Sequence, residues 1–572
     1  MDTLADAVSG SELDRHLRAI AAGVRLSGSP DEAAAFDYAE TQLRSFGYRV
    51  SRYESDALIG YPQRASLDLL GPDPARIAAN GYSLSPGTGP DGVSAEIVYV
   101  GAGLESDYDR VDARGKIVLS DGLAMPAKAL AADRAGAVGQ IHVNDDHVHE
   151  MCLSPVWGTP VPQTASLLPG VPAVGVARAD GDRLKRALAA GPVTVRLVTE
   201  PFRAWVKIPT LIGDLPGTAE ETFVLFSGHI DSWHHGAMDN TAANATQLEV
   251  ARLLAARRGK LRRGLRLAFW SGHSHGRYAG SAWYADAFWH ELHERCACHV
   301  NVDSVGAIGA SVLEEAPTMA ETYGFGRRVL AETAGITLDY KRISRSSDQS
   351  FWGHGVPSLF ASLSEQPRDD SATGATLAQL LGGGAKGGGL GWWWHTLEDT
   401  LDKIDPANLA RDAGVYAEAV ARLCTLERLP FDYAAAADEI ADALARHQER
   451  AANRLDLATT VALARRLGDE LRALPTEGSV PAAGNALVMD LGRLLIPVNY
   501  TRSGPFGQDL ALGTEPLPGL VDVARLGEVA PQSDEARYLR TDLLRERNRV
   551  EHALRASLRR GERFRAETAG EA

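Results

Sequence analysis

The sequence predicts an α/β protein with a mainly parallel sheet flanked by helices, an inserted β-rich domain and a helical C-terminal domain. Between residues 202 and 430, apolar runs alternate with amphipathic segments, which is typical of a parallel sheet covered by helices. Residues 58–201 are dominated by short β-branched runs broken by Gly, Pro and Asp. From residue 431 onward, long segments are rich in Ala, Leu, Arg and Glu and indicate helices.

The domain boundaries follow from these changes in pattern. At about 150 residues per domain, a chain of 572 residues predicts three or four folding units. We expect residues 1–57 and 202–430 to form the main domain, residues 58–201 to be an insert, and residues 431–572 to form the C-terminal domain.

Expected helices and strands follow one another along the first 430 residues. Residues 11–47 carry apolar positions at helical spacing on both sides of Ser29 and Pro30, which predicts two helices. In the insert we expect strands at AEIVYVG, GKIVLSDG, VGQIHVN, PAVGV and VTVRLV, and one helix in AMPAKALAADRAGAVG. In the main domain, strands are expected at FVLFSGH, LRLAFWSG, HVNVDSVG and VPSLFAS.

The last third of the chain is expected to be helical over residues 432–473 and 533–562, with a Pro- and Gly-rich link over residues 474–520. The glycine-rich stretch at residues 381–391 follows no strand and has no GK[ST] ending, so we interpret it as a surface loop and not a phosphate site.

Composition excludes several classes of protein. The net charge is -15 and no segment is strongly basic, which argues against nucleic acid as a partner. No stretch approaches the roughly 20 apolar residues that span a bilayer, and the N-terminus has no basic start or apolar signal core, so we expect a cytoplasmic protein that does not bind membranes. The four cysteines lack metal-site spacing and are expected to be buried thiols.

Polar side chains gather where the predicted strands end. In open α/β sheets, ligands bind beyond the carboxyl ends of the strands. The candidates at these ends are His229 and Asp231, Asp239 before the next helix, the triplet His273, Ser274 and His275, Asp303, and later Asp348 and His395.

The runs SGHIDSW, GAMDN, NVDSVG, SDQSFWGHGVP and WHTLEDTLDKID resemble successive motifs of the co-catalytic zinc exopeptidases, the superfamily of aminopeptidases, glutamate carboxypeptidase II and the transferrin receptor. GKIVLSDG and VPAVGVARADGDRL look like a protease-associated domain. NYTRSGPFGQDLALGTEPLPGLVD and the helix after it are similar to a dimerisation domain, which implies a homodimer.

Carried over residue by residue, the resemblance implies that His229 and Asp303 hold one metal ion, that His395 holds a second, and that Asp239 bridges the two. Asp231 would orient His229. Imidazole and carboxylate ligands suit Zn²⁺, with Co²⁺ or Mn²⁺ as alternatives.

The HSH triplet departs from the family, which has two adjacent glutamates here, a general base and a metal ligand. Aligned from the strand, His273 takes the place of the base and Ser274 that of the ligand. Aligned back from Gly280 and Ser281, Ser274 takes the place of the base and His275 that of the ligand. A catalytic zinc usually has three protein ligands, so either a histidine of the triplet is a ligand or the site holds one ion. His273 or His275 could still accept a proton near neutral pH.

Several neighbouring residues could have either a structural role or a role in the site. Arg277 and Tyr278 could contact substrate, the tryptophans at 392–394 could wall a pocket or fill the core, and His234 and His235 could add a ligand or be solvated. Cys296 and Cys298 are expected to pack in the core, and Glu314 and Glu315 to be a surface pair or to contact a substrate amine.

The sequence thus predicts a metal-dependent hydrolase that cleaves an amide or peptide bond of a small substrate, with a modified active site. The alternative is a non-catalytic dimeric binding protein of the transferrin receptor type, which the loss of both glutamates would favour. The metal content of the purified protein separates the two, because a binding protein should contain none.

Overall fold

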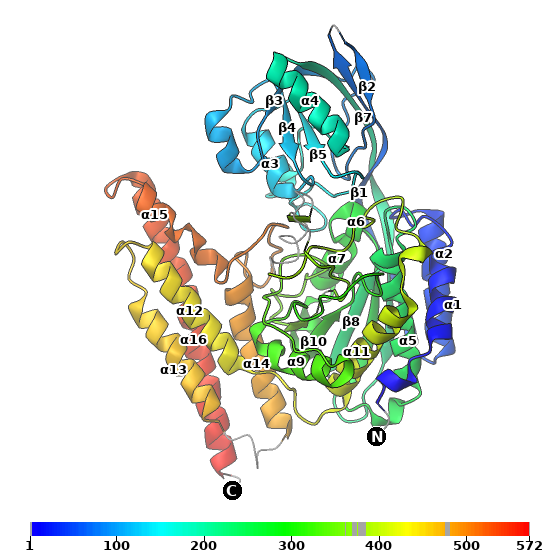
Figure 1. Ribbon diagram of the computed structural model, residues 1–572. Coiled ribbons are helices and arrows are strands. Elements are labelled where there is room, and N and C mark those ends of the chain that lie inside the picture. Colours follow the sequence, from blue (N-terminus) through cyan, green and yellow to red (C-terminus); the bar gives the residue numbers. More distant parts are fainter. Residues whose placement is uncertain are drawn as a thin grey trace.

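The computed structural model of the protein describes residues 3–71, 73–360, 362–368, 374–375, 385–474 and 481–570. Figure 1 shows three parts: a helix-covered sheet, an inserted domain beyond one end of that sheet, and a group of long helices at its side. The predicted α/β class is confirmed, with a sheet that is mixed and not parallel throughout.

The centre of the sheet is parallel and fully buried. β8 (Phe223–His229) lies between β9 (Gly264–Trp270) and β10 (Cys296–Asn301), and β10 is flanked by β11 (Ser358–Leu359), all in parallel. Every residue of β8, β9 and β10 is buried. On the other side, β7 (Thr194–Leu215) runs antiparallel to β9 and to β1 (Arg49–Leu70).

Helices cover both faces of this sheet, which explains why its strands are apolar throughout. Val224 and Phe226 of β8 belong to the larger core, whereas Phe223 and Leu225 belong to a second core on the opposite face. Helices of the main domain that contribute to the larger core are α1 (Gly10–Ile20), α2 (Pro30–Ser45), α5 (Ala243–Ala255), α9 (Ala320–Ala334) and α11 (Pro406–Thr425), and this core continues into the C-terminal helices. The second core includes residues of α7 (Ala279–Ala287) and α8 (Trp289–Arg295).

The insert is built on the extensions of β1 and β7, which pair over residues 49–70 and 194–214. The boundaries expected at 58 and 201 therefore fall inside two continuous strands. β3 (Val93–Tyr99) pairs with β7 and begins a parallel set with β4 (Ile117–Asp121), β5 (Gly139–Val143) and β6 (Ala173–Val176). The helix predicted here is α3 (Pro126–Arg134); α4 (Arg178–Ala190) was not predicted because most of its side chains are charged or small.

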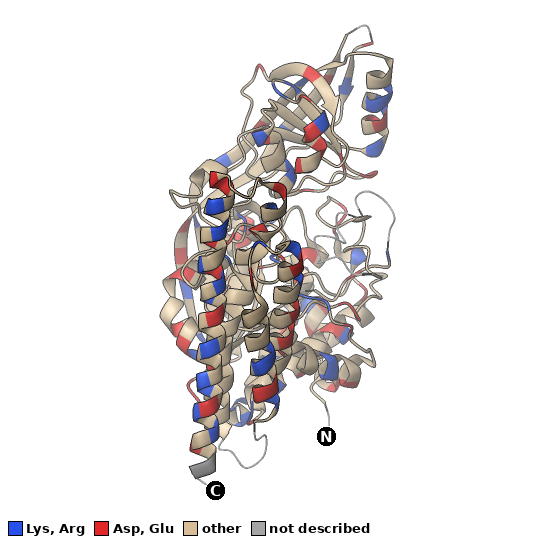
Figure 2. Cartoon of the chain, turned by 90° about the vertical axis from the view of Figure 1, so that its left-hand side faces the viewer, with Lys and Arg blue, Asp and Glu red and all other residues tan. Residues whose placement is uncertain are grey.

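The C-terminal helices are α12 (Tyr433–Arg450), α13 (Ala458–Arg472), α14 (Pro481–Tyr500) and α16 (Asp534–Gly570). The predicted link over residues 474–520 was wrong where α14 lies. Of its prolines, Pro481 stands at the first residue, where a helix tolerates proline, whereas Pro497 lies inside the helix, in its last turn. Acidic and basic residues alternate along these helices (Figure 2).

The cysteines and the glycine-rich stretch were also the subject of sequence predictions. All four cysteines are buried and free, as expected. The predicted glycine-rich loop at residues 381–391 lies partly outside the described residues. Within the described ranges, none of the helices has the length and apolar character needed to cross a membrane.

Candidate metal centre

The carboxyl ends of the central strands bring four of the predicted residues to one place. His229 is the last residue of β8, Asp303 follows β10, and Asp239 lies at a kink with non-helical backbone angles within Ala237–Ala242, the segment that leads into α5. His395 comes from the loop that precedes α11. All four residues are at least nine-tenths buried, and Asp239, Asp303 and His395 line one pocket.

The geometry places carboxylate oxygens around imidazole nitrogens. His229 Nε2 lies 3.1 Å from Asp239 Oδ1 and 3.7 Å from Asp303 Oδ1. The other oxygen of Asp239, Oδ2, lies 2.9 Å from His395 Nε2. Asp239 thus presents one oxygen to each histidine, which is the arrangement that a bridging carboxylate requires.

Backbone carbonyls fix the orientation of both imidazoles. His229 Nδ1 lies 2.8 Å from the carbonyl oxygen of Asp231, and His395 Nδ1 lies 2.7 Å from the carbonyl oxygen of Glu150. A proton on each Nδ1 leaves Nε2 with a free lone pair toward Asp239, as a metal ligand needs. Because Glu150 belongs to the insert, the insert helps to orient His395.

The loop that carries Asp239 is held by Asp399, whose role was not predicted. Asp399 accepts hydrogen bonds from the backbone N–H groups of Met238 and Asp239, at 2.9 and 3.1 Å. Burial raises the pKa of Asp399 to about 7. In the sequence this residue is hidden within the acidic run EDTLDKID, where a solvated face is the default interpretation.

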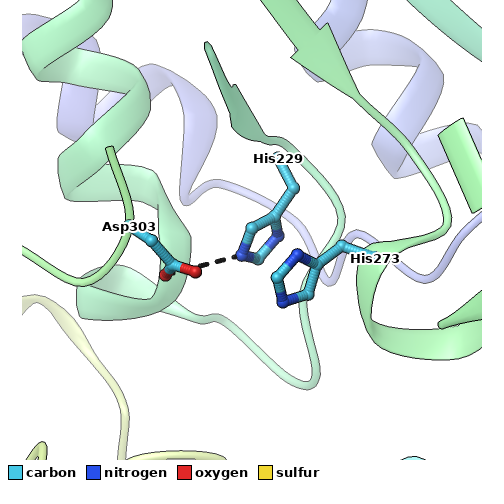
Figure 3. Close-up of side chains that lie close together, drawn as sticks. All are labelled: His229, His273 and Asp303. Atoms are coloured by element: carbon cyan, nitrogen blue, oxygen red, sulfur yellow. Dashed lines mark ion pairs between the residues drawn. The ribbon is translucent and has the colours of Figure 1, made fainter. Parts of the chain in front are cut away.

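Of the HSH triplet, only His273 reaches the cluster. Its ring stacks on that of His229, with centroids 3.6 Å apart and planes inclined by 14° (Figure 3). Its Nδ1 lies 2.7 Å from Asp348 Oδ2, and Asp348 also accepts a hydrogen bond from Ser281 Oγ at 2.6 Å. His273, His229 and Asp303 offer ligand atoms within 4.8 Å of one another.

The stacking argues against His273 and His229 binding the same ion. An imidazole binds a metal through a lone pair that lies in the plane of its ring. Two nearly parallel planes separated by a stacking distance cannot both contain one ion. The geometry therefore favours Asp239 as the third partner of His229 and Asp303, and leaves His273 Nε2 free for another task.

His275 lies outside the cluster, contrary to its prediction as a ligand. Its Nδ1 is 2.9 Å from Ser27 Oγ and 3.7 Å from Asp231 Oδ2, and its ring contacts Trp233 and Tyr61 edge-on. Burial lowers the pKa of His275 to about 4. The short helix α6 (His273–Gly276) turns the first and third residues of the triplet in different directions, so sequence spacing alone could not separate them.

Asp231 contacts both histidine segments, but not as predicted. Its backbone carbonyl orients His229, while its carboxylate is farther away, with Oδ1 3.8 Å from Nδ1. That carboxylate instead accepts hydrogen bonds from the backbone N–H groups of His273 and Ser274, at 3.2 and 2.8 Å. Asp231 therefore positions the start of α6, and with it His273.

The cluster fits a divalent cation. His229 Nε2 and Asp239 Oδ1 are buried and have no hydrogen bond of acceptable geometry, although they are close to each other. Against the effect of burial, the carboxylates of Asp239 and Asp303 raise the pKa of His229 well above its usual value. The same histidines hold the pKa of Asp239 well below its usual range. The site thus attracts positive charge to His229 Nε2, where His and Asp donors suit Zn²⁺.

The other candidates fall into two groups. Arg277, Tyr278 and Trp394 line the pocket, and Trp394 stacks on His395. The remaining candidates lie outside the pocket lining. Trp393 is buried in a core, Trp392 stacks on His147, and Cys296 and Cys298 are buried in β10. His234 lies near Glu150 and His235 near the carbonyl oxygen of Ala21, while Glu314 and Glu315 bind the segment 385–387.

Comparisons with known proteins agree with this architecture. Residues 210–420 match peptidase family M28, and residues 93–184 match the PA domain. A probable glutamate carboxypeptidase of Zea mays is 27% identical over 353 residues, 50% of this chain and 49% of that protein. The alignment thus spans about half of that relative's length. A probable lipoprotein aminopeptidase of Mycobacterium tuberculosis is 27% identical over 69% of this chain and 81% of its own.

Among solved structures, an aminopeptidase from Aneurinibacillus sp. strain AM-1 is similar with a TM-score of 0.55 and 23% identity, over 73% of this chain and 95% of that one. A zinc aminopeptidase from Bacillus subtilis has a TM-score of 0.53 and 23% identity, over 72% of this chain and 94% of that one. At this identity the likeness concerns the fold. The match to peptidase family M28 thus covers the central strands and all four residues of the candidate metal centre, and the match to the PA domain lies within the insert.

Proposed function

We propose that the protein is a metal-dependent hydrolase that cleaves a peptide or amide bond of a small substrate. The observation that carries this proposal is Asp239, whose two oxygens face His229 and His395 in a buried pocket. The relatives named as aminopeptidases and carboxypeptidases support the same class of reaction. A binding protein would have no use for buried, mutually oriented ligand groups, whose desolvation is costly.

We propose that His229, Asp239 and Asp303 hold the principal ion, which gives the three protein ligands of a catalytic zinc. His395 and the remaining oxygen of Asp239 supply two ligands for a second ion, which should bind more weakly. When bound, zinc polarises the substrate carbonyl and makes a water more acidic. Zn²⁺ is our first choice, and Co²⁺ or Mn²⁺ are alternatives.

We assign the transfer of the proton to His273 and not to His275. The hydrogen bond between His273 Nδ1 and Asp348 keeps the proton on Nδ1, so that Nε2 can accept a proton and later donate it to the leaving nitrogen. Asp348 would also stabilise the imidazolium that forms in between, as a carboxylate does beside a catalytic histidine.

The test is the Asp239→Asn variant. An amide cannot offer two anionic oxygens, so we expect bound metal to fall from one or two ions per chain to none, and hydrolysis to fall by at least 10³-fold. Metal is measured by mass spectrometry after extensive dialysis, and activity on amino-acid amides, dipeptides and N-acyl amino acids with Zn²⁺, Co²⁺ or Mn²⁺ added. Wild-type activity in the variant would refute the proposal.

We also propose a homodimer formed through the C-terminal helices. The resemblance to dimerisation domains supports it, and so do the exposed apolar side chains of Tyr538 and Leu544 on α16. Light scattering on the purified protein tests this: a dimer is expected, and a monomer at micromolar concentration would contradict it.

A further inference from the structure

The pocket contains a buried cation that none of the described residues neutralises. Arg277 lines the pocket and is only 7% exposed. Among the described residues, its guanidinium has no hydrogen bond or ion pair, and its Nε is buried without a partner. Its guanidinium carbon lies 5.2 Å from the ring centroid of Tyr278, which is a weak interaction compared with the hydration that burial removes.

The other buried arginines all have several hydrogen-bond or ion-pair partners. Arg25 donates to five backbone carbonyls and to Thr241, Arg263 binds backbone carbonyls and Glu220, and Arg345 binds Gln349, Gln508 and Asp509. Arg266 contacts both Asp214 and Glu291. A guanidinium has five N–H donors, so an arginine left without acceptors in this protein is an exception that calls for an explanation.

The backbone holds Arg277 in place by means that do not involve its side chain. Arg277 and Tyr278 both have left-handed conformations, with φ of 50° and 68°, at the junction of α6 and α7. The carbonyl oxygen of Arg277 accepts a hydrogen bond from Gly158 N of the insert at 2.6 Å. This strained, tethered backbone fixes where Arg277 joins the lining of the pocket that His273 also lines, and such strain is common at functional sites.

We propose that Arg277 determines specificity by binding a carboxylate of the substrate. A planar guanidinium with free donors matches a carboxylate through two parallel hydrogen bonds. The pocket's own carboxylates are engaged elsewhere: Asp239 and Asp303 face His229, and Asp348 is bonded to His273 and Ser281. The substrate class is therefore a short peptide or an N-acyl amino acid that retains a free carboxylate. This inference rests on the proposed hydrolase function.

The first test compares acids with their neutral amides on the wild-type protein. We expect kcat/KM for a dipeptide or an N-acyl amino acid to exceed that for the same compound with an amidated carboxyl group by at least tenfold. Arg277→Met should reduce this ratio to about one, mainly through KM, and Arg277→Lys should restore it only in part because it lacks the planar fork. Arg110→Met, an exposed arginine of the insert, is the matched control and should leave the ratio unchanged.

A binding measurement separates this inference from the proposed function. By calorimetry on chelator-treated protein, N-acetylleucine should bind at least tenfold more tightly than N-acetylleucinamide to the wild type, and equally to Arg277→Met. Equal binding of the two probes to the wild type, or faster hydrolysis of neutral amides, would overturn the role of Arg277 while leaving the hydrolase intact. No hydrolysis of any substrate with any metal, together with a preserved acid preference in binding, would overturn only the hydrolase.

Discussion

At the scale of single residues, the site depends on which nitrogen of each histidine is free. Backbone carbonyl oxygens are hydrogen-bonded to Nδ1 of His229 and His395, and the Asp348 carboxylate is hydrogen-bonded to Nδ1 of His273. In each of these rings Nε2 is therefore the nitrogen left for the site. His275 differs because its Nδ1 contacts Ser27 and its Nε2 is buried without a partner. Two histidines that are equivalent by sequence spacing therefore have separate roles.

This difference predicts opposite outcomes for two matched substitutions. His273→Gln should reduce kcat/KM by at least 10²-fold, because it removes the proton carrier, and should leave the metal content near the wild-type value. His275→Gln should keep activity within about tenfold and lower the melting temperature instead, since a buried network is disturbed. Steady-state kinetics, metal analysis and thermal unfolding of both variants check this. The reverse pattern would show that His275 carries the proton.

At the scale of elements, α9 carries a carboxyl group whose pKa is raised by burial. Glu321 lies in the first turn of α9, is 1% exposed, and neither of its carboxylate oxygens has a hydrogen-bond partner. Burial raises the pKa of Glu321 to about 8. The side chain is therefore neutral in the folded protein at pH 7, where it is ionised in the unfolded chain.

The raised pKa predicts that Glu321 makes the folded protein less stable as the pH rises. Between about pH 4.5 and 8 the folded state holds a proton that the unfolded state has lost, so Glu321 reduces stability by up to about 1.4 kcal/mol for each pH unit of rise. Glu321→Gln removes this dependence. The melting temperature of the variant, relative to the wild type, should increase from pH 5 to pH 8.

The exposed Glu528 supplies the control, because Glu528→Gln should shift the melting temperature by the same amount at both pH values. A Glu321→Gln difference that stayed constant between pH 5 and 8 would contradict the raised pKa.

At the scale of the whole molecule, the C-terminal domain is bonded to the main domain and is not a loose appendage. Arg493 of α14 donates to the backbone carbonyls of His293, Gly355 and Cys296, at 2.5 to 2.6 Å. Trp352 of the main domain packs in a buried cluster with Ile496 and Tyr500 of α14. The insert is joined to the same domain through β1 and β7, and through Glu150 beside His395.

These contacts predict that Arg493→Met lowers the stability of the whole chain. Three buried carbonyls would each lose a charged donor, at a cost on the order of 3 kcal/mol in total. The melting temperature should fall, whereas the metal content of the folded protein should not change. Arg559→Met, an exposed arginine of α16, should have no effect beyond about 0.5 kcal/mol. Equal melting temperatures for the two variants would show that the domains unfold independently.

Much of the fold could be predicted from the sequence because its signals are local. Uninterrupted apolar runs such as FVLFSGH mark strands buried on both faces, and the helices over residues 10–45 begin at Ser9 and Ser29, whose side chains accept backbone hydrogen bonds. α4 and α14 were missed because charge in one case, and proline and glycine in the other, outweigh the apolar periodicity. Tertiary packing overrides such local preferences.

The sequence by itself determined which residues lie near one another, because ligands at the ends of neighbouring parallel strands must share one edge of the sheet. Only the tertiary structure decided what each residue contacts. It turned His273 toward His229 and His275 toward Ser27, placed Asp399 next to the backbone of Asp239, and left Arg277 without an acceptor in the part of the chain that the structure describes. The reason is physical: strand ends are fixed by local pattern, whereas side-chain partners depend on loops and segments that are distant in the chain.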